Sequence, residues 1–303
     1  YDVLDYYLEL SKKESDYLLY EEPMGTVSGV QTQIPVLLSE YQFQSKEDVD
    51  AYLELMKTTP DYFNSLIAFE QEKAQKGLFM ASYTADTVIE QCQAFIDMGD
   101  SNYLISTFVD RIQKLTDLSE SEKSDYIQKN AYMLQTYVLP AYQQLIKTVV
   151  ELKDSGKNEE GLCYLPNGKE YYELTVQAST GSVRTVPQLQ KLTKNQMKDD
   201  LAAMKAVIGL TAEQAKETAV MESTDPKEIL NSLSLDIQKT FPKLPQTSVE
   251  VKYVPKAMEA HLSPAFYMIP ALDDTKENVI YVNQAQMGNK LTLYTTLAHE
   301  GYP

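Results

Sequence analysis

The stretch Ser119–Leu152, SESEKSDYIQKNAYMLQTYVLPAYQQLIKTVVEL, decides the class of fold, because it predicts a long amphipathic helix. Ser119 and Glu122 form a capping box, in which each side chain bonds a backbone amide that the first helical turn leaves free. Pro140 interrupts the pattern, and we expect a kink there because proline lacks the amide hydrogen. The residues that recur at helical spacing are Tyr126, Ile127, Asn130, Ala131, Leu134, Tyr137, Val138, Ala141 and Leu145.

Helical patterns cover most of the remaining chain, so the protein is predicted to be mainly α. The segment Asp225–Glu228 places a cap, a first-turn proline and an acidic residue in the order typical of a helix start. Residues 26–35 are expected to form an extended loop, and residues 154–160 a surface loop. Further helices are predicted over residues 46–57, 60–76, 84–98 and 101–116. Weaker capping pairs are Thr193 with Gln196 and Thr211 with Gln214.

Strand patterns are confined to the last part of the chain. Val249–Val254, Ala265–Ile269 and Val279–Asn283 follow one another closely and predict a small antiparallel β-sheet. A helix that leads to His299 comes directly after this sheet. The predicted fold is therefore a multi-helix single domain over residues 1–303, with a helical part over 1–245 and the sheet plus this last helix over 246–303.

Composition excludes several classes of protein. The formal net charge is -17, with 44 acidic and 27 basic residues, so nucleic acid is an unsuitable partner because phosphate binding needs a basic patch. No apolar run reaches the length of a transmembrane helix. The 22 tyrosines and the absence of tryptophan fit either amphipathic packing or a cleft that grips peptides or glycans. Acidity indicates a solvated surface or, alternatively, a preference for cationic substrates.

Cys92 and Cys163 are too few to form a disulfide framework. We expect two buried free thiols, with a single disulfide between them as the alternative.

The final string His299-Glu300-Gly301-Tyr302-Pro303 carries the chemistry of the chain. A histidine followed by a glutamate on a helix begins the metal site of many zinc peptidases, with the histidine as ligand and the glutamate acting on water. The dipeptide alone also fits an ordinary polar helix end. His261, the other histidine of the chain, is expected to be a surface or capping residue.

A sheet that precedes such a helix has a second use in metallopeptidases, where its edge strand pairs with the backbone of the substrate. Ile280, Tyr281 and Asn283 are the candidates for such an edge.

The string Thr296–Pro303 resembles the start of the motif His-Glu-Gly-Tyr-Pro-Gly-His-His, which marks the bacterial family catalogued as domain of unknown function 885. Gly161–Tyr172 is similar to the "G-x-x-x-L-P-x-G-x-x-Y-Y" segment of that family. Tyr267–Asp274 with Ile280–Asn283 is similar to its "Y-x-x-P-x-x-D … Y-x-V-N" segment. The stretches 35–41 and 48–53 also resemble its earlier part, so the likeness spans nearly the whole chain.

The resemblance implies a mostly helical, zinc-dependent peptidase that is secreted or lipid-anchored, and hence an extracytoplasmic or cell-envelope location. It implies zinc bound by His299 and general-base action by Glu300, with the second histidine and an acidic ligand beyond Pro303. Tyr267, Tyr281 and Asn283 would then line the cleft for a peptide. On this view the chain is a fragment of a longer parent, inactive by itself and a poor binder of zinc.

Two departures from a simple peptidase pattern bear on this expectation. The family motif separates its histidines more widely than H-E-x-x-H, so a regular helix cannot present both on one face. Thr185–Gln188 also lacks the histidine that the family carries in this region. The alternative is a non-enzymatic, extracytoplasmic helical protein that binds peptides or glycans, and a third possibility is a purely structural scaffold. Exopeptidase and endopeptidase activity, and the identity of the metal, stay open.

Overall fold

The structure is a computed structural model. It describes residues 1–27, 29–208, 223–239, 241–242, 248–254, 256, 259, 262–270, 277–288 and 290–302. The fold is mainly α with a small sheet near the end of the chain, as predicted. Backbone contacts divide the chain into two compact units, Tyr1–Lys191 and Leu192–Pro303. The prediction that residues 1–303 form a single domain stays a prediction.

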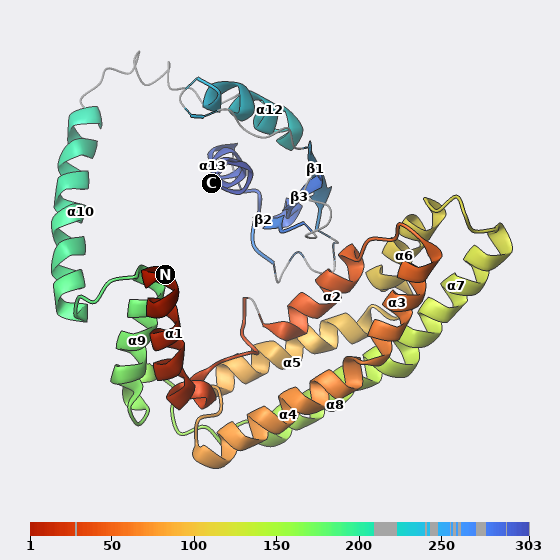
Figure 1. The fold of residues 1–303 in the computed structure, drawn as a ribbon, viewed down its shortest axis with the longest axis horizontal. Helices are drawn as coiled ribbons and strands as arrows, with labels where there is room; N and C mark the ends of the chain where they lie inside the picture. The colour runs from red at the N-terminus through yellow and green to blue at the C-terminus, as the bar shows by residue number, and fades with distance from the viewer. Residues whose placement is uncertain are drawn as a thin grey trace. The chain divides into compact units, whose positions relative to one another are not determined.

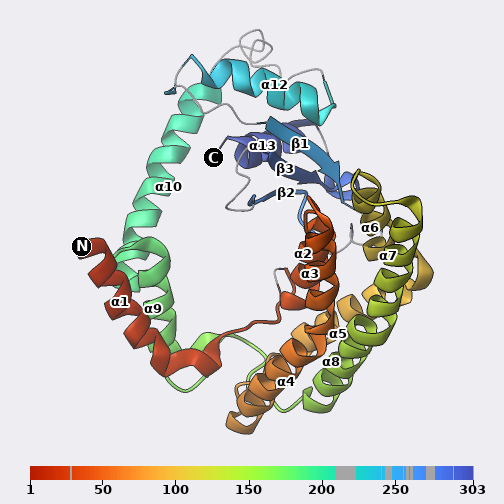
Figure 2. The same ribbon diagram turned by 45° about the vertical axis from the view of Figure 1, so that its right-hand side comes forward.

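The first unit consists of helices. Figures 1 and 2 show α4, α5 and α8 lying side by side, and α1 lying beside α9. Helix α10 crosses the boundary between the units. The α-helices are α1 (Asp2–Glu14), α2 (Val30–Glu40), α3 (Lys46–Lys57), α4 (Thr59–Lys76), α5 (Ser82–Asp97), α6 (Tyr103–Gln113), α7 (Glu120–Met133), α8 (Leu139–Leu152), α9 (Gly168–Thr180) and α10 (Val186–Ile208). The short helices are η1 (Ser15–Tyr20), η2 (Gly99–Ser101), η3 (Leu134–Val138) and η4 (Leu162–Tyr164).

The stretch Ser119–Leu152 folds as its pattern predicts. The capping box of Ser119 and Glu122 starts α7. The helix then passes through the π-helical turn η3 and continues as α8, with Pro140 in the first turn of α8. A π-helical turn just before a proline accommodates the missing amide without ending the helix. The expected interruption at Pro140 is therefore a local change in helical pitch.

Tyr142 of α8 is the centre of the core of the first unit. Its ring lies 4.9 Å from that of Phe63 in α4 and 4.6 Å from that of Phe95 in α5, centroid to centroid. The side chain is fully buried, and its hydroxyl donates a 2.7 Å hydrogen bond to the carbonyl of Gln31 in α2. Tyr142, which the predicted stripe does not include, thus joins four helices.

The expected loop over residues 26–35 is wrong in its second half, because residues from Val30 onward form α2 with Pro35 inside the helix. Proline at this position cannot donate to the carbonyl four residues earlier, which belongs to Gln31. The Tyr142 hydroxyl donates to that carbonyl instead. The helix is therefore completed by a group from α8, which no local pattern reveals.

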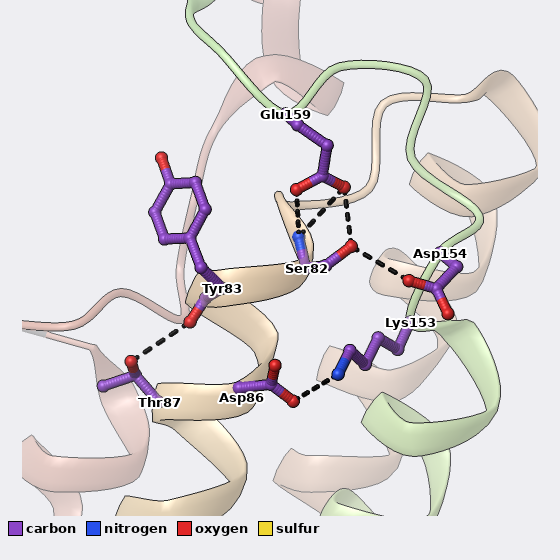
Figure 3. A network of polar contacts seen from close by, with 7 residues as sticks. All are labelled: Ser82, Tyr83, Asp86, Thr87, Lys153, Asp154 and Glu159. Atoms are coloured by element: carbon purple, nitrogen blue, oxygen red, sulfur yellow. Dashed lines mark hydrogen bonds and ion pairs between the residues drawn. The ribbon is translucent and has the colours of Figure 1, made fainter.

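The predicted surface loop over residues 154–160 is confirmed, and its acidic side chains form hydrogen bonds with the first turn of α5. Figure 3 shows the carboxylate of Glu159 above the first turn, where it accepts hydrogen bonds from the Ser82 amide at 2.9 and 3.2 Å. The Ser82 hydroxyl is 3.0 Å from Asp154, and Lys153 forms an ion pair with Asp86. An acidic group at a helix start satisfies free amides and the positive end of the helix dipole. This network anchors the loop to the helix.

Helix α10 begins earlier than the pair Thr193–Gln196 predicts. The Thr185 amide donates to Gln188 at 3.0 Å, and the Gln188 amide donates to the Thr185 hydroxyl at 3.4 Å. These two residues form the capping pair of the helix. The pair Thr211–Gln214 lies outside the described residues.

The second unit contains a three-stranded sheet with the strand order β1-β3-β2. Strand β1 pairs with β3 in parallel, and β2 pairs with β3 in an antiparallel manner. The elements are α12 (Pro226–Ile237), β1 (Ser248–Tyr253), β2 (Ala265–Met268), β3 (Glu277–Val282), η6 (Gln284–Gln286) and α13 (Lys290–Gly301). Asp225 caps α12 as predicted, accepting from the amides of Lys227 and Glu228 at 2.7 and 3.4 Å.

The predicted antiparallel sheet is wrong for one of its two pairings, so the sheet is mixed. Strands β1 and β2 do run in opposite directions, but the connection over residues 254–264 is too long for a tight hairpin. Strand β3 lies between them and is parallel to β1.

An apolar core joins the sheet to α12 and α13. It contains Ile229 and Leu230 from α12, Ile280 and Val282 from β3, and Leu293 and Leu297 from α13. In both views α13 lies beside the sheet and next to α12 (Figures 1 and 2). The end of α13 that carries His299 and Glu300 is therefore packed on a sheet and a second helix.

Candidate functional site

Gly301 and Tyr302 fix the end of α13. A Cβ added to Gly301 would lie 2.6 Å from Cδ2 of Leu230, so the absence of a side chain permits close packing on α12. The Tyr302 hydroxyl donates to the carbonyl of Leu230 at 3.1 Å. The Gly-Tyr part of the terminal string thus anchors the turn that carries His299 and Glu300.

His299 and Glu300 occupy different surroundings on this last turn. His299 is exposed and makes no hydrogen bond or ion pair with any described residue. Glu300 is half-buried, and its Oε2 accepts a 3.0 Å hydrogen bond from the backbone amide of Tyr267 in β2. The imidazole is therefore available as a ligand, and the carboxylate lies against the sheet.

Strand β2 is an edge of the sheet, and Tyr267 faces outward from it. The expectation that Ile280, Tyr281 and Asn283 follow an edge strand is wrong, because β3 is the central strand with a partner on each side. The sequence pattern locates the three short strands but does not show which of them lies in the middle of the sheet. The edge next to Glu300 belongs to β2.

The three predicted substrate residues are not gathered around Glu300. Tyr267 contacts it through the backbone, and its hydroxyl donates to Oδ1 of Asn278 at 2.5 Å. Tyr281 is buried and stacks on Phe266, with ring centroids 5.0 Å apart. Their contact with a substrate stays a prediction.

Asn283 has a clear structural role. The side chain is fully buried, and its Nδ2 donates to the carbonyls of Glu259 and Leu262 at 2.8 and 2.9 Å. Its Oδ1 accepts from the amide of Ala285 at 3.2 Å. The two hydrogen bonds from Nδ2 join the segment before β2 to the segment after β3.

Among the described residues, no group of three or more His, Cys, Asp or Glu side chains is placed to hold an ion. Catalytic zinc takes three protein ligands, with imidazole among the preferred donors. The exposed imidazole of His299 fits as one of these ligands. His261 lies outside the described residues.

The two cysteines are free thiols, as expected, but only Cys92 is buried. Burial raises the pKa of the Cys92 thiol to about 12. Cys163 is exposed in the short helix η4, so the expectation of burial is wrong for this residue.

A buried charged group in the first unit escaped the sequence analysis. Lys73 and Glu70 of α4 are almost inaccessible, and Nζ of Lys73 lies 3.0 Å from Glu22 and 3.7 Å from Glu70. Nζ also donates to the carbonyl of Glu21 at 2.6 Å. Their i,i+3 spacing on the buried face of a predicted helix was the available signal. This cluster ties the segment after η1 to α4.

The chain matches one protein family over its full length. The matching family model is described as "Bacterial protein of unknown function (DUF885)" and covers residues 1–303. No curated protein matches the chain.

A solved structure shows the same fold. It is described as the "putative lipoprotein" from Colwellia psychrerythraea, with a TM-score of 0.73 and 19% sequence identity. The similarity covers 93% of this chain and 52% of the other, so the chain spans about half the length of that protein. None of the helices among the described residues is long and apolar enough to cross a membrane.

Proposed function

The chain belongs to the DUF885 family of bacterial proteins, and from that premise we propose that it forms part of the active site of a zinc-dependent peptidase. The observation that carries the proposal is the 3.0 Å hydrogen bond between Oε2 of Glu300 and the Tyr267 amide. It places the carboxylate of the His-Glu pair at the edge of a sheet. Peptides commonly bind at such edges by adding a strand.

Each residue of the pair has a separate role in the proposed reaction. His299 would hold the zinc as one of its protein ligands, and the remaining ligands come from outside the described residues. Bound zinc supplies a Lewis acid for the hydrolysis of a carbonyl compound. Glu300 accepts a proton from the attacking water and later gives it to the leaving amine. The water attacks the carbonyl carbon, and the carbon–nitrogen bond breaks.

We further propose a cell-envelope location, with the complete protein anchored by lipid. The support is the fold that this chain shares with the Colwellia protein described as a lipoprotein. The net charge of -17 agrees with a partner other than nucleic acid.

The test is peptide cleavage and zinc content in the full-length protein and two variants. His299→Ala is expected to lose zinc and activity together. Glu300→Gln should keep its zinc but lose activity by about 10²-fold or more, since a general base contributes 10²–10⁴-fold. Glutamine keeps an oxygen that can accept from the Tyr267 amide, so this variant preserves the structural contact.

Glu250→Gln is the matched control, because it removes one exposed carboxylate from the same unit. It should retain wild-type activity. Full activity in Glu300→Gln would refute the assigned role of Glu300. Peptide binding without cleavage by zinc-loaded wild-type protein would favour the non-enzymatic binding protein.

A further inference from the structure

We propose that the backbone amide of Tyr267 is a binding position for a main-chain carbonyl of a peptide, and that Glu300 occupies this position until the peptide arrives. The inference rests on the proposed function only in taking a peptide as the ligand. It concerns a competition between two acceptors for one donor.

The ladder of the sheet shows why this amide is free to bind outside it. In an antiparallel pair, residues alternate between hydrogen-bonded positions and positions whose amide and carbonyl face away. The Asn283 amide donates to the carbonyl of Pro264 at 2.8 Å, which places Pro264 at a bonded position. Counting along β2, Tyr267 opposite Ile280 falls at an outward position.

Glu300 is the group that now meets this outward amide, at 3.0 Å. The Tyr267 carbonyl faces the same way, so one residue offers a donor and an acceptor to an added strand. Ile269, just beyond β2, exposes 81% of its surface and extends the edge with an apolar side chain. Among the described residues, the Glu300 carboxylate is the group that meets the donor of this edge.

An amide hydrogen forms one good hydrogen bond, so a peptide carbonyl and the Glu300 carboxylate exclude each other at this position. Binding of a peptide breaks the bond between Oε2 and the Tyr267 amide and forms a bond from the same amide to the peptide. The carboxylate is then released beside the bound backbone. Peptide binding and release of the base become a single event.

The test measures peptide affinity in full-length protein freed of zinc, so that no cleavage occurs. The probe is a capped, fluorescein-labelled hexapeptide of alternating alanine and serine, read by fluorescence anisotropy. Its neutrality removes long-range attraction to the acidic protein. Glu300→Ala should bind this probe about tenfold more tightly, because a competing charge-assisted hydrogen bond is lost.

Tyr267→Pro should bind the probe about tenfold more weakly, because proline removes the amide hydrogen. Proline is tolerated on an edge strand where the amide faces away from the sheet. Glu250→Gln, which removes an exposed carboxylate elsewhere in the same unit, should bind within about twofold of wild type. Glu300→Gln keeps an acceptor oxygen without the charge, so its affinity should lie between those of wild type and Glu300→Ala.

Unchanged or weaker binding by Glu300→Ala overturns the inference, as does the absence of any binding by this variant. The Glu300→Ala variant leaves the backbone unchanged, so its affinity decides the question even if Tyr267→Pro fails to fold. If the protein never hydrolyses peptides but Glu300→Ala binds the probe more tightly, the proposed peptidase activity is refuted and this inference stands. If zinc-dependent cleavage occurs but Glu300→Ala does not bind the probe more tightly, the peptidase activity stands and this inference is refuted.

Discussion

Gly168 occupies a position where no other residue fits. A Cβ built on it would lie 1.6 Å from the carbonyl oxygen of Leu162, a backbone atom that cannot move aside like a side-chain end. The preceding Asn167 adopts a left-handed conformation with φ 53°. The glycine in the Pro-Asn-Gly turn is therefore needed for close approach between η4 and the start of α9.

Gly168→Ala should lower the free energy of unfolding by about 2 kcal/mol or more, since the new methyl group forces the two segments apart. Urea unfolding of the full-length protein measures this change. Gly161→Ala is the control, because it lies in the same loop with no atom within 4 Å of the added carbon. Equal stability of the two variants would contradict the steric argument.

Glu70 makes the stability of the first unit depend on pH. Burial raises the pKa of its carboxyl to about 7, although Lys73 acts in the opposite direction. The unfolded chain loses this proton near pH 4.5, so between about pH 4.5 and 7 the folded state binds more protons than the unfolded state. The contribution of Glu70 to stability therefore falls as pH rises through this window, by about 3 kcal/mol in total.

Glu70→Gln should consequently gain stability relative to wild type at pH 8 and lose that advantage at pH 5. Lys73 keeps Glu22 and the Glu21 carbonyl as partners in this variant. Urea midpoints at the two pH values report the difference. Glu72→Gln, an exposed change on the same helix, should show no such pH dependence. A wild-type-like pH profile in Glu70→Gln would count against the argument.

The residue scale also shows where sequence analysis stops. His299 and Glu300 could be proposed as site residues from the sequence, because the proposed chemistry depends on two adjacent residue types on a helix. The contact between Glu300 and the Tyr267 amide could not, since it depends on which strand forms the edge of the sheet. Glu70 and Lys73 were hidden because charged residues in a helical pattern usually lie at the surface.

At the scale of elements, the clearest case is α2, a helix with a proline inside it. Local rules place a boundary near Pro35, and the prediction of a loop followed them. The structure supplies the missing donor from the Tyr142 hydroxyl, at 2.7 Å from the carbonyl of Gln31. By contrast, the bounds of α3 agreed with the pattern, because its capping box and apolar stripe lie within one segment.

Tyr142→Phe should therefore destabilise the protein by about 1–3 kcal/mol, because the buried carbonyl of Gln31 loses its partner. Tyr103→Phe is the control, since the Tyr103 hydroxyl is buried and has no hydrogen-bond partner among the described residues. Its removal should be neutral or stabilising. Thermal and urea unfolding of both variants compare the two hydroxyls directly. A larger loss in Tyr103→Phe would show that the Tyr142 bond does not support α2.

At the scale of the whole molecule, the fold class followed from periodicity, because helical and alternating patterns are properties of single segments. Strand positions were found to within a few residues for the same reason. The mixed order β1-β3-β2 was not, because pairing is decided by the packing of β3 between its neighbours and under α12 and α13. The same limit applies to the proposed metal site, whose ligands would be brought together only by tertiary structure.

Zinc affinity gives a test at this last scale. Among the described residues, no three His, Cys, Asp or Glu side chains are placed to hold an ion, whereas catalytic zinc takes three protein ligands. If His299 is one of these ligands, its replacement by alanine should remove a bond to the metal. The full-length protein should retain one zinc ion and lose it on His299→Ala. Stoichiometric zinc that persists in His299→Ala would show that His299 is not a ligand, and the assignment proposed here would be wrong.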